Sequence, residues 1–296
     1  MEADAATSAH DAVSENNDSG NDSGNEIGVE MNPATTSSSS EVHPKLGKKA
    51  LRRQKREQLW ISVKERKKRK KEEAKASRPP VVEAPLDMSE AAVLMRKERS
   101  IMKRESFLMR VNEGASIVID CGFDNAMTSR EMKSLSQQVM FSYGANKRSE
   151  SPASVFLTSL RGELESNMRN IAGFSTWLGF TATAQSYMDV FHKDRLVYLT
   201  ADSPNVITDL DVNKVYIIGG IVDRNRLKGA TYEKAQQQGI ATAKLPLDQV
   251  LEMGQSTRVL TVNHVFQILV NYMTVRDWTQ ATLSALPGRK GAQAKS

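Results

Sequence analysis

The sequence contains a single cysteine, Cys121, among its 296 residues. One cysteine excludes an intramolecular disulfide and a zinc site built from several cysteines. It lies in the apolar run SIVIDCGF, where a small buried hydrophobic residue is the expected role. This cysteine usage favours a reducing, intracellular compartment.

Histidine and the common catalytic motifs are also scarce. The chain has four scattered histidines, with no HExxH motif and no Cys/His spacing typical of zinc. It has no GxGxxG after an apolar run, no GxxxxGK[ST] and no GxSxG. These absences argue against a metal-dependent enzyme, a Rossmann or P-loop nucleotide site, and a serine hydrolase. We therefore expect no metal.

Long hydrophobic runs are missing too. No apolar stretch approaches the length that spans a bilayer, and no secretory apolar segment is present, so no membrane association is expected. The first residues are acidic, whereas mitochondrial presequences are rich in arginine and poor in acids. We expect the protein in the nucleus, the cytoplasm or both.

Charge is distributed unevenly along the chain. Residues 1–44 contain nine acidic residues and no lysine or arginine, which gives a net charge of −9. With almost no apolar residues to bury, this segment is predicted to be a disordered tail. Residues 45–78 contain 16 basic and 4 acidic residues, a net charge of +12. So positive a segment favours a polyanionic partner.

The basic segment KKALRRQKREQLWISVKERKKRKKEEAKA lacks glycine and proline and is rich in helix formers, which predicts an extended helix. Arg53–Glu57, Lys68–Glu72 and Arg69–Glu73 have the i,i+4 spacing that supports a helix. Three interpretations are open: a solvated charged helix, a nuclear-import signal at KERKKRKK, or an arm that follows a nucleic-acid backbone. The segment SRPPVVEAP that follows is predicted to be a stiff linker.

From residue 89 onward, helical and strand patterns alternate. SEAAVLMRKERSIMKRESFLMR predicts a helix that leads into a domain. SIVIDCGF, SVFLTSL, RLVYLTAD and VYIIGG are predicted strands, and IATAKLPL is a further short segment. SREMKSLSQQVMFSYGANKR, capped by Thr128 or Ser129, LKGATYEKAQQQ and TVNHVFQILVNYMTV are predicted helices. This order indicates an α/β domain with a mostly parallel sheet.

In such sheets ligands bind at the carboxyl ends of the strands. Three of these ends carry notable residues: LTADSP, IGGIVDRN and KLP. Gly219 and Gly220 allow close approach to the backbone. Asp223 could accept a proton, bind a ribose or stabilise a turn. The cations that follow it, Arg224, Arg226 and Lys228, could bind a phosphate or form an ordinary solvated face.

Six sequence blocks follow one another along the chain: IVIDCGFD, SLSQQV, LVYLTADSP, VYIIGGIVDRNR, KLPL and RVLTVNHVFQIL. Together they resemble the tRNA guanine-N1 methyltransferases that modify purine nine, a branch of the SPOUT superfamily. The resemblance spans about residues 89–286 and leaves out residues 1–44. It implies S-adenosylmethionine as cofactor, tRNA as substrate, a deep trefoil knot in the C-terminal part of the sheet, and a monomer. The implied domains are a tail (1–44), a basic extension and linker (45–87), the SPOUT domain (88–286) and a C-terminal tail (287–296).

The same resemblance assigns residues to the site. Asp223 is the implied catalytic residue, because guanine N1 carries a proton that a nearby carboxylate could accept directly or through water. Orientation of the base is the alternative role. The implied cofactor-binding residues come from three loops and the start of two helices: Leu199, Thr200, Ala201, Gly220, Arg224, Asn225, Arg226, Leu227, Lys228, Tyr232, Lys244, Leu245, Val259, Leu260 and Thr261.

Several further residues have a weaker assignment. Asp120 is either part of the active-site wall or, preferably, a structural cap at a strand end. Gln138 is either in that wall or, preferably, on a helix surface. Thr261 could cap the final helix. Asn146, Lys147 and Arg148, with the basic residues after Asp223, are candidates to face the RNA.

Two other functions compete with guanine methylation. Adenine N1 carries no proton, so an enzyme specific for adenine, or for both purines, would not need Asp223 as a base. A catalytically silent RNA-binding scaffold is the second alternative. Its expected signature, loss of the site carboxylate or of the glycine loop, is not found, because both are present.

Overall fold

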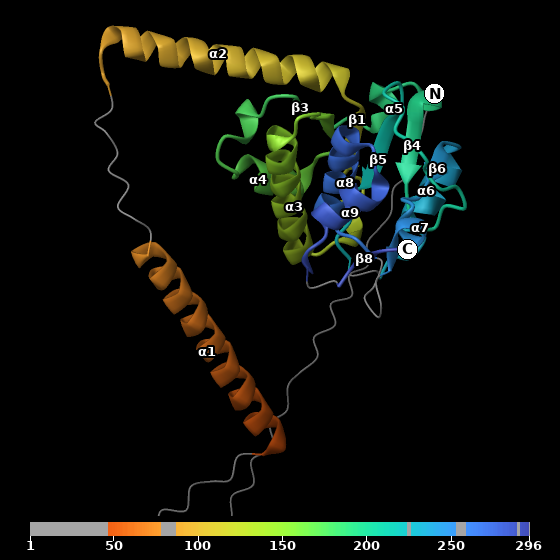
Figure 1. Ribbon diagram of the computed structural model, residues 1–296. Coiled ribbons are helices and arrows are strands. Elements are labelled where there is room, and N and C mark those ends of the chain that lie inside the picture. Colours follow the sequence, from red (N-terminus) through yellow and green to blue (C-terminus); the bar gives the residue numbers. More distant parts are fainter. Residues whose placement is uncertain (1–46, 78–86, 224–225, 253–258, 289–290, 296) are drawn as a thin grey trace, which may run out of the picture. The chain divides into compact units, whose positions relative to one another are not determined.

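The computed structural model describes residues 47–77, 87–223, 226–252, 259–288 and 291–295. The chain divides into two units, Met1–Ala84 and Pro85–Ser296, which are described separately (Figure 1). The predicted acidic tail and most of the predicted linker lie outside the described residues.

The described part of the first unit is one long helix, α1 (Lys48–Ala76), over the residues predicted from sequence. Two of the predicted i,i+4 ion pairs form: Lys68–Glu72 at 3.8 Å and Arg69–Glu73 at 3.6 Å. Trp60 is 64% exposed, with the Lys64 ammonium 5.1 Å from the centre of its ring. The helix is thus supported by helix propensity and weak surface pairs rather than by a core.

The second unit begins with α2 (Glu90–Glu113), whose first turn is capped by the Ser89 side chain. Only Phe107 and Val111 of this helix are buried, both near its end. The apolar side chains earlier in α2, such as Leu94 and Ile101, are exposed. The helix therefore packs on the domain through its last turns.

The core of the second unit is a six-stranded, fully parallel sheet with strand order β3-β2-β1-β5-β4-β6 (Figure 1). This confirms the predicted α/β class with a parallel sheet. β1 is central and pairs with β2 on one side and β5 on the other. The strands are β1 (Ser116–Asp120), β2 (Ser154–Thr158), β3 (Phe180–Ala182), β4 (Leu196–Leu199), β5 (Val215–Gly219) and β6 (Ala241–Ala243). A separate antiparallel pair joins β7 (Leu251–Glu252) to β8 (Gln293–Ala294).

Helices cover both faces of the sheet. On one face Ile117 and Ile119 of β1 join the core that contains Leu135 of α3 and Phe266 of α8. On the other, Val118 of β1 packs in a cluster with residues of α5 and α6. This alternation follows from the two-residue period of a strand. The helices are α3 (Ser129–Arg148), α4 (Gly162–Arg169), α5 (Tyr187–Val190), α6 (Ala230–Gln238), α7 (Leu247–Val250), α8 (Val262–Val275) and α9 (Trp278–Ala285).

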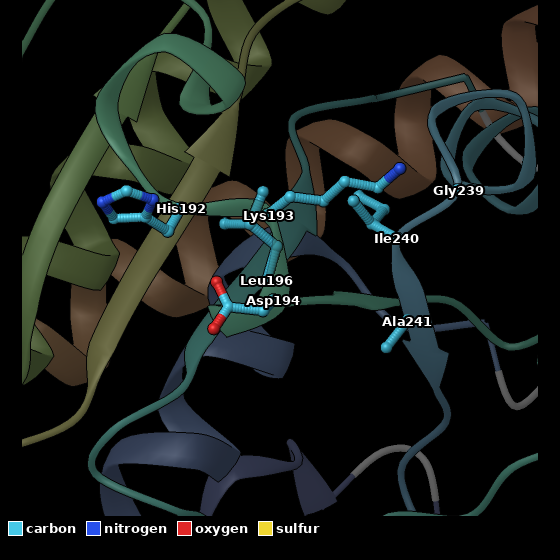
Figure 2. A pocket seen from close by; sticks show the side chains of 7 residues that line it. All are labelled: His192, Lys193, Asp194, Leu196, Gly239, Ile240 and Ala241. Carbon is cyan, nitrogen blue, oxygen red and sulfur yellow. The ribbon is translucent and has the colours of Figure 1, made fainter.

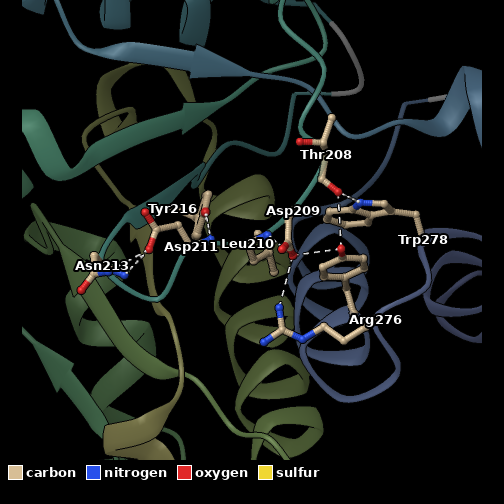
Figure 3. Close-up of polar contacts among 9 residues, drawn as sticks. Thr208, Asp209, Leu210, Asp211, Asn213, Tyr216, Arg276 and Trp278 are labelled. Atoms are coloured by element: carbon tan, nitrogen blue, oxygen red, sulfur yellow. Dashed lines mark hydrogen bonds and ion pairs between the residues drawn. The ribbon is translucent and has the colours of Figure 1, made fainter.

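The loop after β4 is held by the C-terminal helices (Figure 3). The indole of Trp278 donates to the carbonyl of Thr208 at 2.9 Å, and the Tyr272 hydroxyl to Asp209 at 3.0 Å. Arg276 pairs with Asp209 at 3.2 Å. The backbone N–H of Leu210, first, and the Tyr272 hydroxyl lower the pKa of Asp209. The C-terminal helices thereby fix a loop that lies more than sixty residues earlier in the chain.

The opposite side of this loop pairs with the residue that follows β6. The N–H of Ile207 donates to Lys244 at 2.9 Å, and the N–H of Lys244 donates to Asn205 at 2.8 Å. The loop after β4 therefore lies between the end of β6 and the C-terminal helices.

Candidate functional site

The carboxyl ends of the parallel strands meet at one edge of the sheet, as predicted. Two backbone hydrogen bonds join neighbouring ends there. The N–H of Gly220, after β5, donates to the carbonyl of Asp120 in β1 at 2.8 Å. The N–H of Thr200, after β4, donates to Ala243 in β6 at 2.9 Å. The loops predicted to form the site therefore begin from one continuous edge.

Gly220 has no room for a side chain. A Cβ at this position would lie 2.6 Å from the carbonyl oxygen of Asp120, which belongs to the backbone of the central strand. Glycine is therefore required here by close approach of two backbone segments. Because Gly220 lacks a side chain, the backbone after β5 can lie directly against the backbone of β1.

Asp120 is completely buried, with 0% exposure. Its carboxylate accepts hydrogen bonds from the N–H of Gly122 at 3.0 Å and the Tyr198 hydroxyl at 2.8 Å. The ammonium of Lys234 in α6 completes the set at 2.5 Å. A buried carboxylate requires such partners, because removing a charge from water is costly. From sequence we preferred a structural cap at the end of a strand as the role of Asp120, and the bond to Gly122 fits that role. The links to β4 and α6 were not predicted.

The groups around Asp120 have shifted pKa values. Burial, reinforced by the negative charge of Asp120, raises the pKa of Tyr198 well above its ordinary value. Burial raises the pKa of the Cys121 thiol as well, with Asp120 adding to the effect. Both groups are therefore held in their neutral forms. Cys121 is a packed thiol, as its apolar sequence context predicted.

Asp223 is half-buried at the start of a turn. Its carboxylate accepts a hydrogen bond from the N–H of Leu227 at 2.5 Å, and its carbonyl accepts from the N–H of Arg226 at 3.2 Å. The turn-stabilising role considered from sequence is thus observed. The bond to Leu227 also fixes the direction of the carboxylate, as a reacting group requires.

Arg226 is committed to contacts within the protein. Its guanidinium donates to the carbonyl of Ala126 at 2.8 Å and lies 3.5 Å from Glu131. Glu131 also accepts from the backbone N–H of Thr128, and this bond is the main cause of its lowered pKa. Arg226 therefore ties the turn to the start of α3. Arg224 and Asn225 lie outside the described residues, and Lys228 is exposed.

The remaining predicted cofactor residues occupy the neighbouring loops. Leu199 and Thr200 are buried, and the Thr200 hydroxyl accepts a bond from Thr231 of α6 at 3.0 Å. Leu245 and Leu260 are half-buried and pack against the main core. Tyr232 and Lys244 are half-buried, whereas Ala201, Val259 and Thr261 are exposed.

Two predictions at the start of α8 are wrong. Thr261 makes no side-chain cap, because its hydroxyl bonds instead to Asn263 and His264. Gln138 is not a helix-surface residue: it is 8% exposed, and its side-chain oxygen accepts from the N–H of Val262 at 3.0 Å. Gln138 in α3 thus satisfies a helix terminus that lies 124 residues later in the chain.

The proposal that Asn146 faces RNA is also wrong. Asn146 is completely buried, and its amide group accepts from the N–H of Ala153 at 2.8 Å and donates to the carbonyl of Ala153 at 2.9 Å. It holds the connection between α3 and β2. Because α3 runs back from the site edge, this connection lies at the opposite edge of the sheet, as do Lys147 and Arg148.

A hollow of about 510 Å³ lies at this opposite edge, where β4 and β6 begin (Figure 2). Its polar lining residues His192, Lys193 and Asp194 are exposed. The hollow is separated from Asp223 by the length of the strands, so its volume does not mark the site predicted from sequence.

In the part of the chain that the structure describes, no group of three or more His, Cys, Asp or Glu side chains could hold a metal ion. Nor does any described helix have the length and apolarity required to cross a membrane.

Comparison with known families identifies the chain. The family model described as tRNA (guanine(9)-N(1))-methyltransferase TRM10/TRM10A matches residues 44–291. The chain belongs to this family. A tRNA (guanine(9)-N1)-methyltransferase of Schizosaccharomyces pombe is 36% identical over 265 residues, which cover 88% of this chain and 85% of that protein. The resemblance to tRNA guanine-N1 methyltransferases that modify purine nine is therefore confirmed.

Other TRM10 relatives match a shorter region. The human tRNA methyltransferase 10 homolog A is 42% identical over 183 residues, which cover 62% of this chain and 54% of that protein. A crystal structure described as spTrm10(Full length)-SAH complex is 41% identical, with a TM-score of 0.55. The match covers 59% of this chain and 97% of that chain. A second, spTrm10(74), is 40% identical with the same TM-score, and covers 58% and 94%.

Proposed function

We propose that this chain transfers the methyl group of S-adenosylmethionine to N1 of guanosine nine in tRNA. The observation that carries the proposal is the TRM10/TRM10A match over residues 44–291, because it includes the basic helix as well as the domain. The S. pombe relative, matched over 85% of its length, is named for this reaction.

The edge of the sheet fits the cofactor chemically. Adenine requires apolar walls with backbone donors and acceptors close by. Leu199, Leu245 and Leu260 offer apolar surface beside the loops, and the turn at Gly220 brings backbone close to the strand ends. A relative was crystallised as an SAH complex. Bound S-adenosylmethionine supplies an electrophilic methyl group. The predicted cofactor residues in the three loops stand as the proposed contacts.

Asp223 is the proposed catalytic carboxylate. Guanine N1 must lose its proton for its lone pair to attack a methyl group, and a carboxylate held in place can accept or relay that proton. The N–H of Leu227 holds the Asp223 carboxylate in a fixed direction. The same bond equally suits a carboxylate that orients the base, so comparing methylation of the two purines separates the two roles.

The decisive experiment measures single-turnover methyl transfer to two tRNA transcripts that differ only in having G or A at position nine. Mass spectrometry locates the product. N1-methylguanosine on the G transcript alone supports the proposal, and transfer to the A transcript would revise the base specificity. Absence of transfer to both, with tRNA still bound, would favour the silent scaffold.

The variant Asp223→Asn separates the two roles of the carboxylate. It keeps the size and an oxygen acceptor for Leu227 but lowers basicity. We expect guanine methylation to slow by roughly 100-fold, within the range for general-base catalysis, with less effect on any adenine methylation. Equal losses on both bases would assign Asp223 to base orientation.

The basic helix α1 is the proposed tRNA-binding arm. Residues 45–78 have a net charge of +12, and each cation placed on a phosphate releases a counterion. Deleting residues 1–78 should weaken tRNA binding and reduce its salt dependence while leaving cofactor binding intact. Unchanged tRNA affinity would refute this role.

We infer that the C-terminal part of the domain is knotted. Support comes from the loop after β4, which pairs with Lys244 on one side and with Tyr272 and Trp278 on the other. A chain that passes from β6 to α8 through this loop would form the trefoil. A crystal structure of residues 88–286 would trace the path directly.

A single chain with its own basic arm is also proposed to act as a monomer, in the nucleus, the cytoplasm or both. Light scattering during size-exclusion chromatography tests the monomer. A fluorescent fusion tests the compartment.

A further inference from the structure

Asp223 lies between two residues, Gly220 and Lys234, that both contact Asp120. At the start of the segment that carries Asp223, the N–H of Gly220 donates to the backbone carbonyl of Asp120 at 2.8 Å. After its end, Lys234 in the second turn of α6 reaches the Asp120 carboxylate at 2.5 Å. Backbone and side chain of Asp120 therefore hold opposite ends of the same segment. We call these two attachments, with Asp120, Gly220 and Lys234, the Asp120 clamp.

The surroundings of Lys234 hold its ammonium group in a fixed position against Asp120. Its side chain is only 23% exposed. Its ammonium lies 4.5 Å from the ring centre of Phe123 and 5.5 Å from that of Tyr187, so two aromatic faces stabilise the cation. A partly buried lysine with one carboxylate and two rings as partners has little conformational freedom.

The clamp sets the position of α6, and α6 limits where the preceding turn can lie. Gly229, just before α6, has a φ of 78°, a left-handed conformation that glycine adopts without strain. The Thr231 hydroxyl bonds to Thr200 at 3.0 Å, which joins the first turn of α6 to the loop after β4. Rotation of α6 about its axis would break both the Lys234 and the Thr231 contacts. The helix therefore has one defined orientation. Its first residue, Ala230, donates to the carbonyl of Leu227 at 3.4 Å, and the N–H of Leu227 holds the Asp223 carboxylate.

We propose that Lys234 is a positioning residue for methyl transfer: through its ion pair with buried Asp120, it holds the segment that carries Asp223 against the central strand. This inference rests on the proposed function, because the rate it affects is that of methyl transfer. Lys234 acts on the reaction only through the segment and touches neither the methyl group nor the base.

The test compares Lys234→Met with Lys234→Arg, which keeps the charge. Lys214→Met is the matched control, because its ammonium donates to the carbonyl of Asp194 at 2.9 Å near the start of β5, at the opposite edge. Hydrogen exchange of the Gly220 and Leu227 amides is measured without ligand. The single-turnover methylation rate is then measured with saturating S-adenosylmethionine, and the KM for tRNA is measured in a separate series of tRNA concentrations.

We expect Lys234→Met to accelerate exchange at Gly220 and Leu227 and leave amides of the β1–β2 pairing protected. The single-turnover rate should fall roughly 10- to 100-fold, the scale of a small misplacement of reacting groups. The KM for tRNA should change much less than the rate, because α1 is intact. Lys234→Arg should recover part of the rate, and Lys214→Met should match the unmodified protein in both measurements.

Because Lys234→Met leaves a buried carboxylate without its cation, it could fail to fold. The double variant Asp120→Asn/Lys234→Met removes both charges and keeps the side-chain oxygen that accepts from Gly122. It should fold, yet retain fast exchange at Leu227 and the lowered rate. Full recovery of the rate in the double variant would overturn the proposal, because the charge pair would then serve folding alone.

The two hypotheses fail separately. An unmodified protein that does not methylate refutes the proposed function, while the exchange measurement still tests the clamp. An active protein in which Lys234→Met keeps both the protected amides and the full rate refutes the clamp alone.

Discussion

The two edges of the parallel sheet are built from similar residue types with opposite consequences. At the carboxyl edge, Asp120 is fully buried and shared by β1, β4 and α6. At the amino edge, His192, Lys193 and Asp194 line an open hollow and are exposed to solvent (Figure 2). The comparison teaches that constrained charge, rather than open volume, distinguishes the edge with the proposed site, because a side chain in water has no fixed direction.

The amino edge also contains a fully buried polar residue, and it should affect stability alone. Asn146→Ala removes both hydrogen bonds to Ala153 and leaves two buried backbone groups without partners. We expect the free energy of unfolding to fall by about 2–4 kcal/mol. The methylation rate per folded molecule should not change. Denaturant unfolding measures the free energy of unfolding. Single-turnover methylation, normalised to the amount of folded protein, measures the rate. A lower rate per folded molecule would show that the amino edge also contributes to methylation.

A glycine at each edge provides the next contrast. Gly220→Ala places a methyl group 2.6 Å from a backbone oxygen of β1, a steric cost of about 1–3 kcal/mol. If the cofactor contacts this turn, its affinity should fall roughly 10- to 100-fold in calorimetry. Gly144→Ala is the control. Its Cβ would meet only the end of Arg148 at 3.4 Å, and alanine should stabilise α3 by up to about 1 kcal/mol. Unchanged cofactor affinity in Gly220→Ala would move the pocket elsewhere.

The tyrosine beside Asp120 predicts a loss of stability at high pH. Burial raises the pKa of Tyr198 above its ordinary value of 10.0. The folded state therefore holds its proton while the unfolded state loses it. The stabilising contribution is complete below pH 10 and declines above it, by about 1.4 kcal/mol per pH unit until the folded pKa is reached. Denaturant unfolding between pH 9 and 11 measures the slope. Tyr198→Phe should reduce that slope, and an unchanged slope would contradict the assignment.

The smallest effect is expected at the open hollow. His192→Ala and Lys193→Ala change exposed side chains, so the free energy of unfolding should change by no more than about 0.5 kcal/mol. Cofactor affinity and methylation rate should match those of the unmodified protein. A rate reduced at saturating substrate would show that the amino edge takes part in the reaction after all.

Local signals in the sequence predicted much of the fold. The helix predicted from SREMKSLSQQVMFSYGANKR is α3. As predicted, Thr128 caps its start, and Thr128 and Glu131 together form a capping box. The pattern of VYIIGG predicted β5, which is buried at every position. β3 was missed because three residues, Phe180–Ala182, are too few for a two-residue period to be seen. α9 was missed because TLSA and its neighbours have little apolar contrast.

The wrong and missing assignments of polar residues share a different cause. Gln138, Asn146 and Lys234 are polar residues on helices, and polar helical residues are usually solvated. Each is instead positioned by a partner outside its own helix: Val262, Ala153 or Asp120. No spacing rule connects Lys234 with a carboxylate 114 residues earlier. Asp223 was a candidate from its position after a strand, and the resemblance then implied its catalytic role, which stays a prediction. Its bond to Leu227 is local enough for the turn to be expected.

The position of β1 at the centre of the sheet has a consequence for synthesis on the ribosome. Ser116 pairs with Ser154 on one side but with Val215 on the other. The nascent chain must therefore emerge well past β5 before the first strand has both neighbours, and α8, which fills the same core, emerges later still. Until then the exposed edge of β1 is open to other chains. A translation product that ends before β5 would therefore leave β1, four of whose five residues are buried in the folded domain, without its β5 neighbour.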